Sequence, residues 1–248
     1  QWEKEKLEPD GLFRQIDGCD GMEVSIGGSG KRATINSYMY ADATAIAKIA
    51  TLAGKPEIAQ RFHEKAERIK KLVQSKLWDS KAQFFKTLPR DKDSLVDVRE
   101  LHGYTPWYAN LPDGGYEQAW KQIMDPQGFY APYGPTTAEQ RHAGFRLSYE
   151  GHECQWNGPS WPYATSVTLT AMANLLNNYR QDVVSNADVI TWENLYFANS
   201  VSKSDFGDVT CAQVVFKANP TSLGIKSRQF KVDVTRLITP HLDGGAPE

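Results

Sequence analysis

The chain has 248 residues, of which 40% are hydrophobic and 23% charged, and its formal net charge is −2. This composition is typical of a globular protein with a large core, and the balance of acidic and basic residues argues against a nucleic acid partner. No apolar run approaches the ~18 residues of a membrane-spanning helix, so no membrane contact is expected. The three cysteines are too few and too scattered for a disulfide framework or a zinc module. Neither a metal nor a cofactor is expected.

Residues 17–32, "DGCDGMEVSIGGSGKR", form a glycine-rich segment that holds three carboxyl side chains. Asp17, Asp20 and Glu23 lie among its glycines, directly before a predicted helix. A carboxyl held by glycine turns near Arg32 and a helix N-terminus can be positioned as a general acid. A solvated acidic loop is the alternative. A calcium loop of the EF-hand type is excluded because no Glu stands at the required twelfth position.

Two helices follow, at residues 34–53 and 56–78. Apolar side chains recur at three- and four-residue spacing in both segments, Gly54 ends the first helix, and Pro56 suits the first turn of the second. The short connection predicts an antiparallel helical hairpin. Residues 79–114 contain "FFKTL", which favours a small strand, and a long aromatic loop, while residues 116–124 predict a short helix. Long aromatic loops between helices usually line a site.

The phrase "HECQWNGPSWPY" at residues 152–163 precedes another helix, predicted from about Trp161 to Tyr179. Trp156 and Trp161 flank "NGPS", so Asn157 can offer its amide to hydroxyl groups while the indoles present flat faces, the combination that binds sugars. The alternative is a helix-starting turn with two core tryptophans. We expect the two indoles to differ in environment, with one opening onto a cleft while the other anchors the helix.

After residue 181 the character of the sequence changes. The stretches "CAQVVFKA" and "RQFKVDVTRLI" favour strands, and "LDGGAPE" is typical of a flexible end. We therefore divide the chain into a helical domain at residues 1–182 and a divergent segment at residues 183–248, which could belong to the same domain.

Three of these stretches together resemble inverting glycosidases with an (α/α)6 barrel, among them trehalase, the processing α-glucosidases of glycoside hydrolase family sixty-three and mannosylglycerate hydrolase. "GMEVS" followed by Arg32 resembles the segment that carries their general acid. "NSYMYADATAIAKIATLAGK", with the closing "LWDSKAQFF", resembles the helix pair behind that segment, and "NGPSWPYAT" resembles their signature before a later helix. The resemblance covers roughly residues 17–182 and implies a mainly helical fold, part or all of a six-hairpin (α/α)6 toroid.

The resemblance also implies residue roles. The general acid follows the Gly-Met pair and falls on Glu23, where most members carry Asp, and Asp20 is the alternative. The general base is a Glu downstream of the tryptophan signature, and "ENLYFANS" at residues 193–200 resembles the beginning of its stretch, which points to Glu193. The expected substrate pocket consists of Asp20, Arg32, Asn36, Tyr38, Trp107, Tyr133, Trp156, Asn157 and Trp161.

The function expected from this resemblance is inverting hydrolysis of an oligosaccharide or glycoside. Such a mechanism needs two carboxyl groups ~6.5–9.5 Å apart, which leaves room for a water molecule. A non-catalytic carbohydrate-binding or structural helical domain is the alternative, and a phosphorylase or lyase of similar fold is a third. A complete toroid needs more chain than these residues supply, so we expect another segment or chain to complete the barrel.

Overall fold

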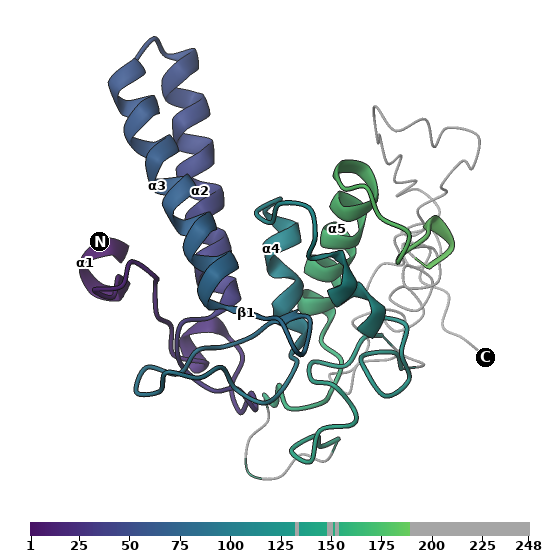
Figure 1. The fold of residues 1–248 in the computed structure, drawn as a ribbon. Helices are drawn as coiled ribbons and strands as arrows, with labels where there is room; N and C mark the ends of the chain where they lie inside the picture. The colour runs from purple at the N-terminus through teal and green to yellow at the C-terminus, as the bar shows by residue number, and fades with distance from the viewer. Residues whose placement is uncertain (132–133, 148–150, 152–153, 189–248) are drawn as a thin grey trace, which may run out of the picture.

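The computed structural model describes residues 1–131, 134–147, 151 and 154–188, and the predicted strands after residue 181 lie outside this part. Figure 1 shows a mainly helical molecule in which one long hairpin projects from the body. In chain order, the elements are α1 (Trp2–Lys6), the 3-10 helix η1 (Gly18–Asp20), α2 (Ala33–Leu52), α3 (Pro56–Lys76), β1 (Trp78–Asp79), β2 (Phe84–Phe85), the 3-10 helix η2 (Leu101–Tyr104), α4 (Thr105–Tyr108), the 3-10 helix η3 (Glu117–Gln122) and α5 (Pro162–Asn178). None of the described helices is long and apolar enough to cross a membrane.

The helical hairpin predicted from the sequence is confirmed as α2 and α3. Gly54 adopts the left-handed conformation, with a φ of 66°, and its N–H donates to the carbonyl of Thr51, which closes the end of α2. Pro56 is the first residue of α3 and follows the N-cap residue Lys55. The buried side of α3, which includes Ile69 and Val73, packs along α2.

Helix α2 is apolar on more than one face. Ala43 and Ala50 are buried, whereas Ile46, Ile49 and Leu52 are exposed, and Leu52 is 89% exposed. The outer face of α3, by contrast, carries many charged side chains. A helix that is apolar all round is typical of an inner position in a helical assembly, and an amphipathic helix is typical of an outer one.

An aromatic core lies beside the base of the hairpin. The small strand predicted in "FFKTL" is present as β2, which pairs antiparallel with β1 and buries Phe84 and Phe85 completely. Tyr104 packs against Phe84 and Trp120, with ring centroids 5.0 and 4.2 Å apart. The short helix predicted at residues 116–124 is the 3-10 helix η3, which places Trp120 in this core.

Helix α5 was predicted within one residue at each end. It packs against α4, and its buried side chains include Met172 and Leu175. Val184, just beyond it, is also buried in the core, so the chain continues along the helical body after residue 182. Figure 1 shows that α2 and α5 both begin at the lower end of the molecule, where the loops before them gather.

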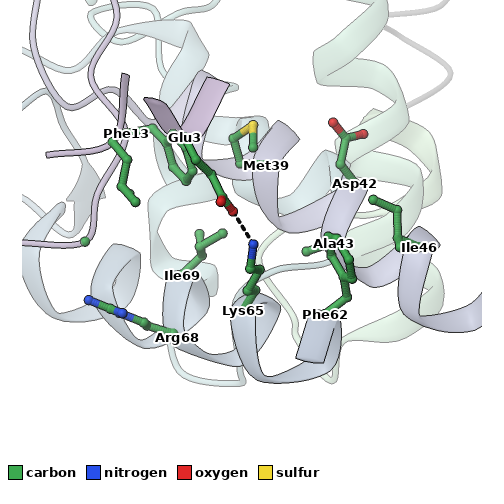
Figure 2. A pocket seen from close by; sticks show the side chains of 12 residues that line it. Glu3, Phe13, Met39, Asp42, Ala43, Ile46, Phe62, Lys65, Arg68 and Ile69 are labelled. Carbon is green, nitrogen blue, oxygen red and sulfur yellow. Dashed lines mark hydrogen bonds and ion pairs between the residues drawn. The ribbon is translucent and has the colours of Figure 1, made fainter. Parts of the chain in front are cut away.

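A pocket lies between α1 and the outer side of the α2–α3 hairpin. Its lining includes the apolar side chains of Phe13, Met39 and Phe62, and an ion pair between Glu3 and Lys65 ties α1 to α3 beside it (Figure 2). None of the residues that line this pocket belongs to the substrate pocket predicted from the sequence. Most of the predicted site residues lie instead around the start of α2 and of α5.

Candidate active site

The glycine-rich loop before α2 is held in a defined shape by its own backbone. The 3-10 helix η1 ends at Gly21, whose φ of 67° is left-handed, and the N–H of Met22 then donates to the carbonyl of Asp17 at 2.9 Å. The hydroxyl of Ser29 donates to the carboxylate of Asp17 at 3.0 Å, which joins the two ends of the loop. The loop therefore turns sharply and presents the residues after Met22 at its tip.

Arg32, the N-cap residue of α2, is fully buried under this loop. Its guanidinium donates to the carboxylate of Asp20 at 2.9 Å, to the hydroxyl of Ser25 at 3.1 Å and to the carbonyl of Gly28. Thr34 donates a further hydrogen bond to the same oxygen of Asp20. The expectation that Arg32 contacts substrate is corrected, because its donors are aimed at the loop and no part of it reaches the surface.

Glu23 lies at the tip of the loop and is half-buried. Within the described part of the chain its carboxyl group makes no hydrogen bond and no ion pair, whereas its backbone carbonyl accepts a hydrogen bond of 3.0 Å from the N–H of Trp156. The next residue, Val24, has a φ of 62°. A β-branched residue in this left-handed region costs about 1–3 kcal/mol, and such strain is concentrated at functional sites.

The segment that contains Trp156 and Trp161, residues 154–163, is named the tryptophan phrase below, and it lies against this loop. The indoles of Trp156 and Trp161 stack in parallel, with ring centroids 5.6 Å apart and an angle of 6° between the planes. Trp156 is 7% exposed, and Trp161, the N-cap residue of α5, is half-buried. The two indoles thus differ in exposure, but they form one stacked pair, and the expectation that one of them opens onto a cleft stays a prediction. The side-chain oxygen of Asn157 is buried and lacks a hydrogen-bond partner among the described residues.

Three tyrosines complete the candidate site from α2, α4 and α5. The hydroxyl groups of Tyr38 and Tyr163 are 3.4 Å apart, and the ring of Tyr108 meets that of Tyr38 edge-on with centroids 6.5 Å apart. Burial raises the pKa of Tyr38 far above its ordinary value, and the hydrogen bond with Tyr163 and the negative charge of Asp20 raise that pKa further. The Tyr38 hydroxyl therefore keeps its proton at neutral pH.

Sequence reasoning missed Tyr163, which is 59% exposed in the first turn of α5. The available signal was its place in "NGPSWPY", directly after Pro162. The next two residues of α5, Ala164 and Thr165, are buried, and Tyr163 lies outside this buried face. Tyr108 was missed as well, because nothing local distinguishes it from its neighbour Trp107.

Two predicted pocket residues belong to the core instead. Trp107 is fully buried and packs edge-on against Phe85 and Trp120, so the expectation that it binds substrate is corrected. Asn36 is also fully buried, and its amide exchanges hydrogen bonds of 2.8 Å with the backbone N–H and carbonyl of Phe13. These bonds occupy Asn36 in fixing the chain before the loop.

Two other predicted site residues, Tyr133 and the proposed base Glu193, lie outside the described residues. Of the predicted set, the structure brings together Asp20, Glu23 and Tyr38 with the Trp156–Trp161 pair, through the contacts given above. In the described part of the chain, no three His, Cys, Asp or Glu side chains gather closely enough to hold a metal ion.

Comparisons with known proteins agree with this arrangement. Residues 1–204 match the family described as "Mannosylglycerate hydrolase MGH1-like glycoside hydrolase domain". A solved structure named "Sialidase" is 46% identical, with a TM-score of 0.77, over 82% of this chain and 19% of that one. The family sixty-three mannosylglycerate hydrolase from Thermus thermophilus, solved with glucose, is 16% identical, with a TM-score of 0.55, over 70% of this chain and 39% of that one.

The chain therefore spans from about a fifth to two fifths of the solved structures it matches. The likeness to the hydrolase confirms the predicted fold class, mainly helical and part of an (α/α)6 toroid. The family match covers the glycine-rich loop at residues 17–32, named the acid loop below, together with the helical hairpin and the tryptophan phrase, which carried the resemblance in the sequence. This chain belongs to the mannosylglycerate hydrolase MGH1-like glycoside hydrolase domain family.

Proposed function

We propose that this chain carries the acid side of the active site of an inverting glycosidase that hydrolyses an oligosaccharide or glycoside. One observation carries the proposal: Glu23 presents a partly exposed carboxyl group, unengaged by any described residue, on a strained loop that is bonded to the tryptophan phrase. A general acid needs this combination of a fixed backbone and a side chain that is free to reach the leaving oxygen.

The geometry favours Glu23 over Asp20 as the acid. One oxygen of Asp20 already accepts hydrogen bonds from Arg32 and Thr34, and its side chain is only 7% exposed. Protonating a sugar from Asp20 would require breaking this buried pair, which costs several kcal/mol. Asp20 instead fixes Arg32, and Arg32 fixes the loop that holds Glu23.

In the proposed mechanism, Glu23 donates its proton to the glycosidic oxygen as the bond to the anomeric carbon breaks. A second carboxylate removes a proton from a water molecule that attacks the same carbon from the opposite face, so the product has the inverted configuration. Glu193 is our proposed base. The family match extends to residue 204 and so includes it, which supports the assignment.

Aromatic rings and tyrosine hydroxyl groups around Glu23 would bind the sugar. The half-buried Trp161 offers an apolar surface to the C–H groups of a ring, with Trp156 stacked beneath it. The side-chain oxygen of Asn157 is buried, so the polar contacts with sugar hydroxyls would come from the hydroxyl groups of Tyr38 and Tyr163, which can donate or accept. The activity that a similar structure's name gives is not assigned to this chain, because the matched part covers only 19% of the protein named sialidase. We therefore propose no particular sugar.

We further propose that additional helical hairpins, from another segment or chain, complete the toroid around this part. The partial coverage of the matched structures supports this proposal, as does the apolar stripe that Ile49 and Leu52 expose on α2. An inner helix of a closed toroid would bury this stripe.

Replacing the proposed acid tests the function. The protein is screened against aryl glycosides and oligosaccharides, and Glu23→Gln is compared with wild type on the best oligosaccharide and on the glycosyl fluoride of the same sugar. Because fluoride leaves without a proton, Glu23→Gln lowers kcat/KM for the oligosaccharide by at least ~10²-fold and that for the fluoride far less.

Asp20→Asn is the matched variant. It is expected to destabilise the loop and to lower both activities together, since it breaks the pair with Arg32. Selective loss of oligosaccharide hydrolysis in Asp20→Asn, with Glu23→Gln fully active, would assign the acid to Asp20. Tight oligosaccharide binding without hydrolysis by wild type would favour the carbohydrate-binding alternative.

A further inference from the structure

A buried carboxylate outside the predicted site contacts the acid loop. Glu100 is 3% exposed and begins η2 as its N-cap residue. One of its oxygens accepts a hydrogen bond of 3.1 Å from the backbone N–H of Gly27, four residues after Glu23. A Cβ atom at position 27 would lie 2.4 Å from the other oxygen, so only glycine allows this close approach.

Two buried charged side chains, Arg32 and Glu100, therefore make hydrogen bonds to the acid loop. Arg32, at the start of α2, holds the hydroxyl of Ser25 and the carbonyl of Gly28, while Glu100 holds the N–H of Gly27 between them. Hydrogen bonds to charged groups are worth more than neutral ones, and a buried charge that loses its partner is costly. These contacts fix the stretch that follows the strained Val24.

The same segment also leads to the tryptophan phrase. Glu100 forms an isolated antiparallel bridge with Ala138, and the N–H of Leu101 donates to the carbonyl of Thr137 at 2.9 Å. The hydroxyl of Thr137 accepts from the N–H of Gly158 at 3.1 Å and donates to the carbonyl of Pro159 at 3.0 Å. The chain around Glu100 thus joins the acid loop to "NGPS" by a continuous set of hydrogen bonds.

Charges around Glu100 keep it ionised. Burial, the largest single influence, raises the pKa of Glu100, and the hydrogen bond with His102 at 3.1 Å and the electrostatic interaction with His102 act in the opposite direction. The charge of Arg32 and the hydrogen bond from Gly27 add to this lowering, and the net pKa lies below the ordinary value for Glu. The group that holds the loop is a carboxylate at neutral pH.

We propose that Glu100 is a positioning residue of the glycosidase: its carboxylate, packed on the backbone of Gly27, fixes the loop that carries Glu23 relative to the tryptophan phrase. The contacts above support the structural part, that Glu100 fixes the loop. The catalytic part, that Glu100 thereby places the acid, rests on the proposed function. Glu100 touches no substrate and acts only through the loop.

Hydrogen–deuterium exchange of the whole chain measures the structural part. Glu100→Gln keeps the shape of the side chain and removes its charge, so the amides of residues 25–28 are expected to exchange at least ~10-fold faster than in wild type. His102→Gln keeps a donor toward Glu100 and removes the imidazole ring, and a smaller change in the same direction is expected.

Glu139→Gln is the matched control. Glu139 is a buried carboxylate, 5% exposed, next to Ala138, but it binds Arg99 at 2.8 Å and Arg141 rather than the acid loop. Its replacement removes a buried charge from the same segment, and no change at residues 25–28 is expected. Equal exchange at residues 25–28 in Glu100→Gln and wild type, or equal acceleration there in both Gln variants, would overturn the inference.

Kinetics measure the catalytic part. In Glu100→Gln, kcat/KM for the oligosaccharide chosen in the screen falls at least ~10-fold, while that for the glycosyl fluoride falls less, because only the former needs a well-placed acid. Equal loss on both substrates would contradict a positioning role. If wild type hydrolyses neither substrate, the proposed function fails, and the exchange measurement still decides whether Glu100 fixes the loop.

Discussion

Val24 is the most informative single residue beside the proposed acid. Its left-handed backbone, with a φ of 62°, is one that β-branched side chains avoid, and 42% of the residue is exposed, so packing does not explain why valine stands there. The surrounding bonds impose the conformation: the carbonyl of Glu23 on one side accepts from Trp156, and Arg32 holds Ser25 on the other. Strain of this kind is concentrated at functional sites, and here it lies next to the proposed acid.

Val24→Asn is therefore expected to stabilise the protein. Asn tolerates the left-handed region, so the free energy of unfolding, measured by urea denaturation, should rise by about 1 kcal/mol. Val96 is half-buried and has no positive φ, and Val96→Asn, the control, should lower the free energy of unfolding. A loss of stability in Val24→Asn as large as in Val96→Asn would show that the loop is not strained at this residue.

At the residue scale, local motifs located the candidate site, and the roles of its residues stay predictions. Glu23 and the tryptophans were chosen because glycine turns and "NGPSWP" are visible in a few consecutive letters. Trp107 was assigned wrongly because its burial depends on Phe85 and Trp120, which come from other elements. Glu100 was missed for the same reason, since its partner Gly27 is far away in the sequence.

Helices α2 and α3 have different roles in the hairpin. The charged outer face of α3 and the apolar faces of α2 correspond to outer and inner positions of a helical toroid, and the start of α2 holds Arg32 and Tyr38 at the candidate site. Gly54 and Pro56 made this hairpin predictable, because each enforces a backbone conformation by itself. The 3-10 form of η3 was not predictable, since packing of Trp120 decides it.

Substitutions on the two faces of the hairpin should have very different effects. Ile49 is 64% exposed, so Ile49→Lys should change the free energy of unfolding of this chain by no more than about 0.5 kcal/mol. Ile69 is 6% exposed, and Ile69→Ala should cost about 2–4 kcal/mol through the cavity it leaves. Urea denaturation of both variants checks this, and a large loss in Ile49→Lys would mean that the stripe on α2 is covered in the chain alone.

At the scale of the whole molecule, the chain matches part of a helical toroid. The fold class was predictable because the acid loop, hairpin and tryptophan phrase occur in a fixed order, and the family match over residues 1–204 agrees with that order. The substrate was not predictable, because the sugar would be selected by the far side of the pocket. Two of the predicted site residues, Tyr133 and Glu193, lie outside the described residues.

The central claim is that Glu23 acts as the acid of an inverting mechanism, and the stereochemistry of the product tests it most directly. Wild type is mixed with the oligosaccharide found in the screen, and NMR follows the anomeric proton before the free sugar mutarotates. Inverting hydrolysis gives a first product with the configuration opposite to that of the substrate, and Glu23→Gln is expected to form it at least ~10²-fold more slowly. A first product with retained configuration would contradict the account.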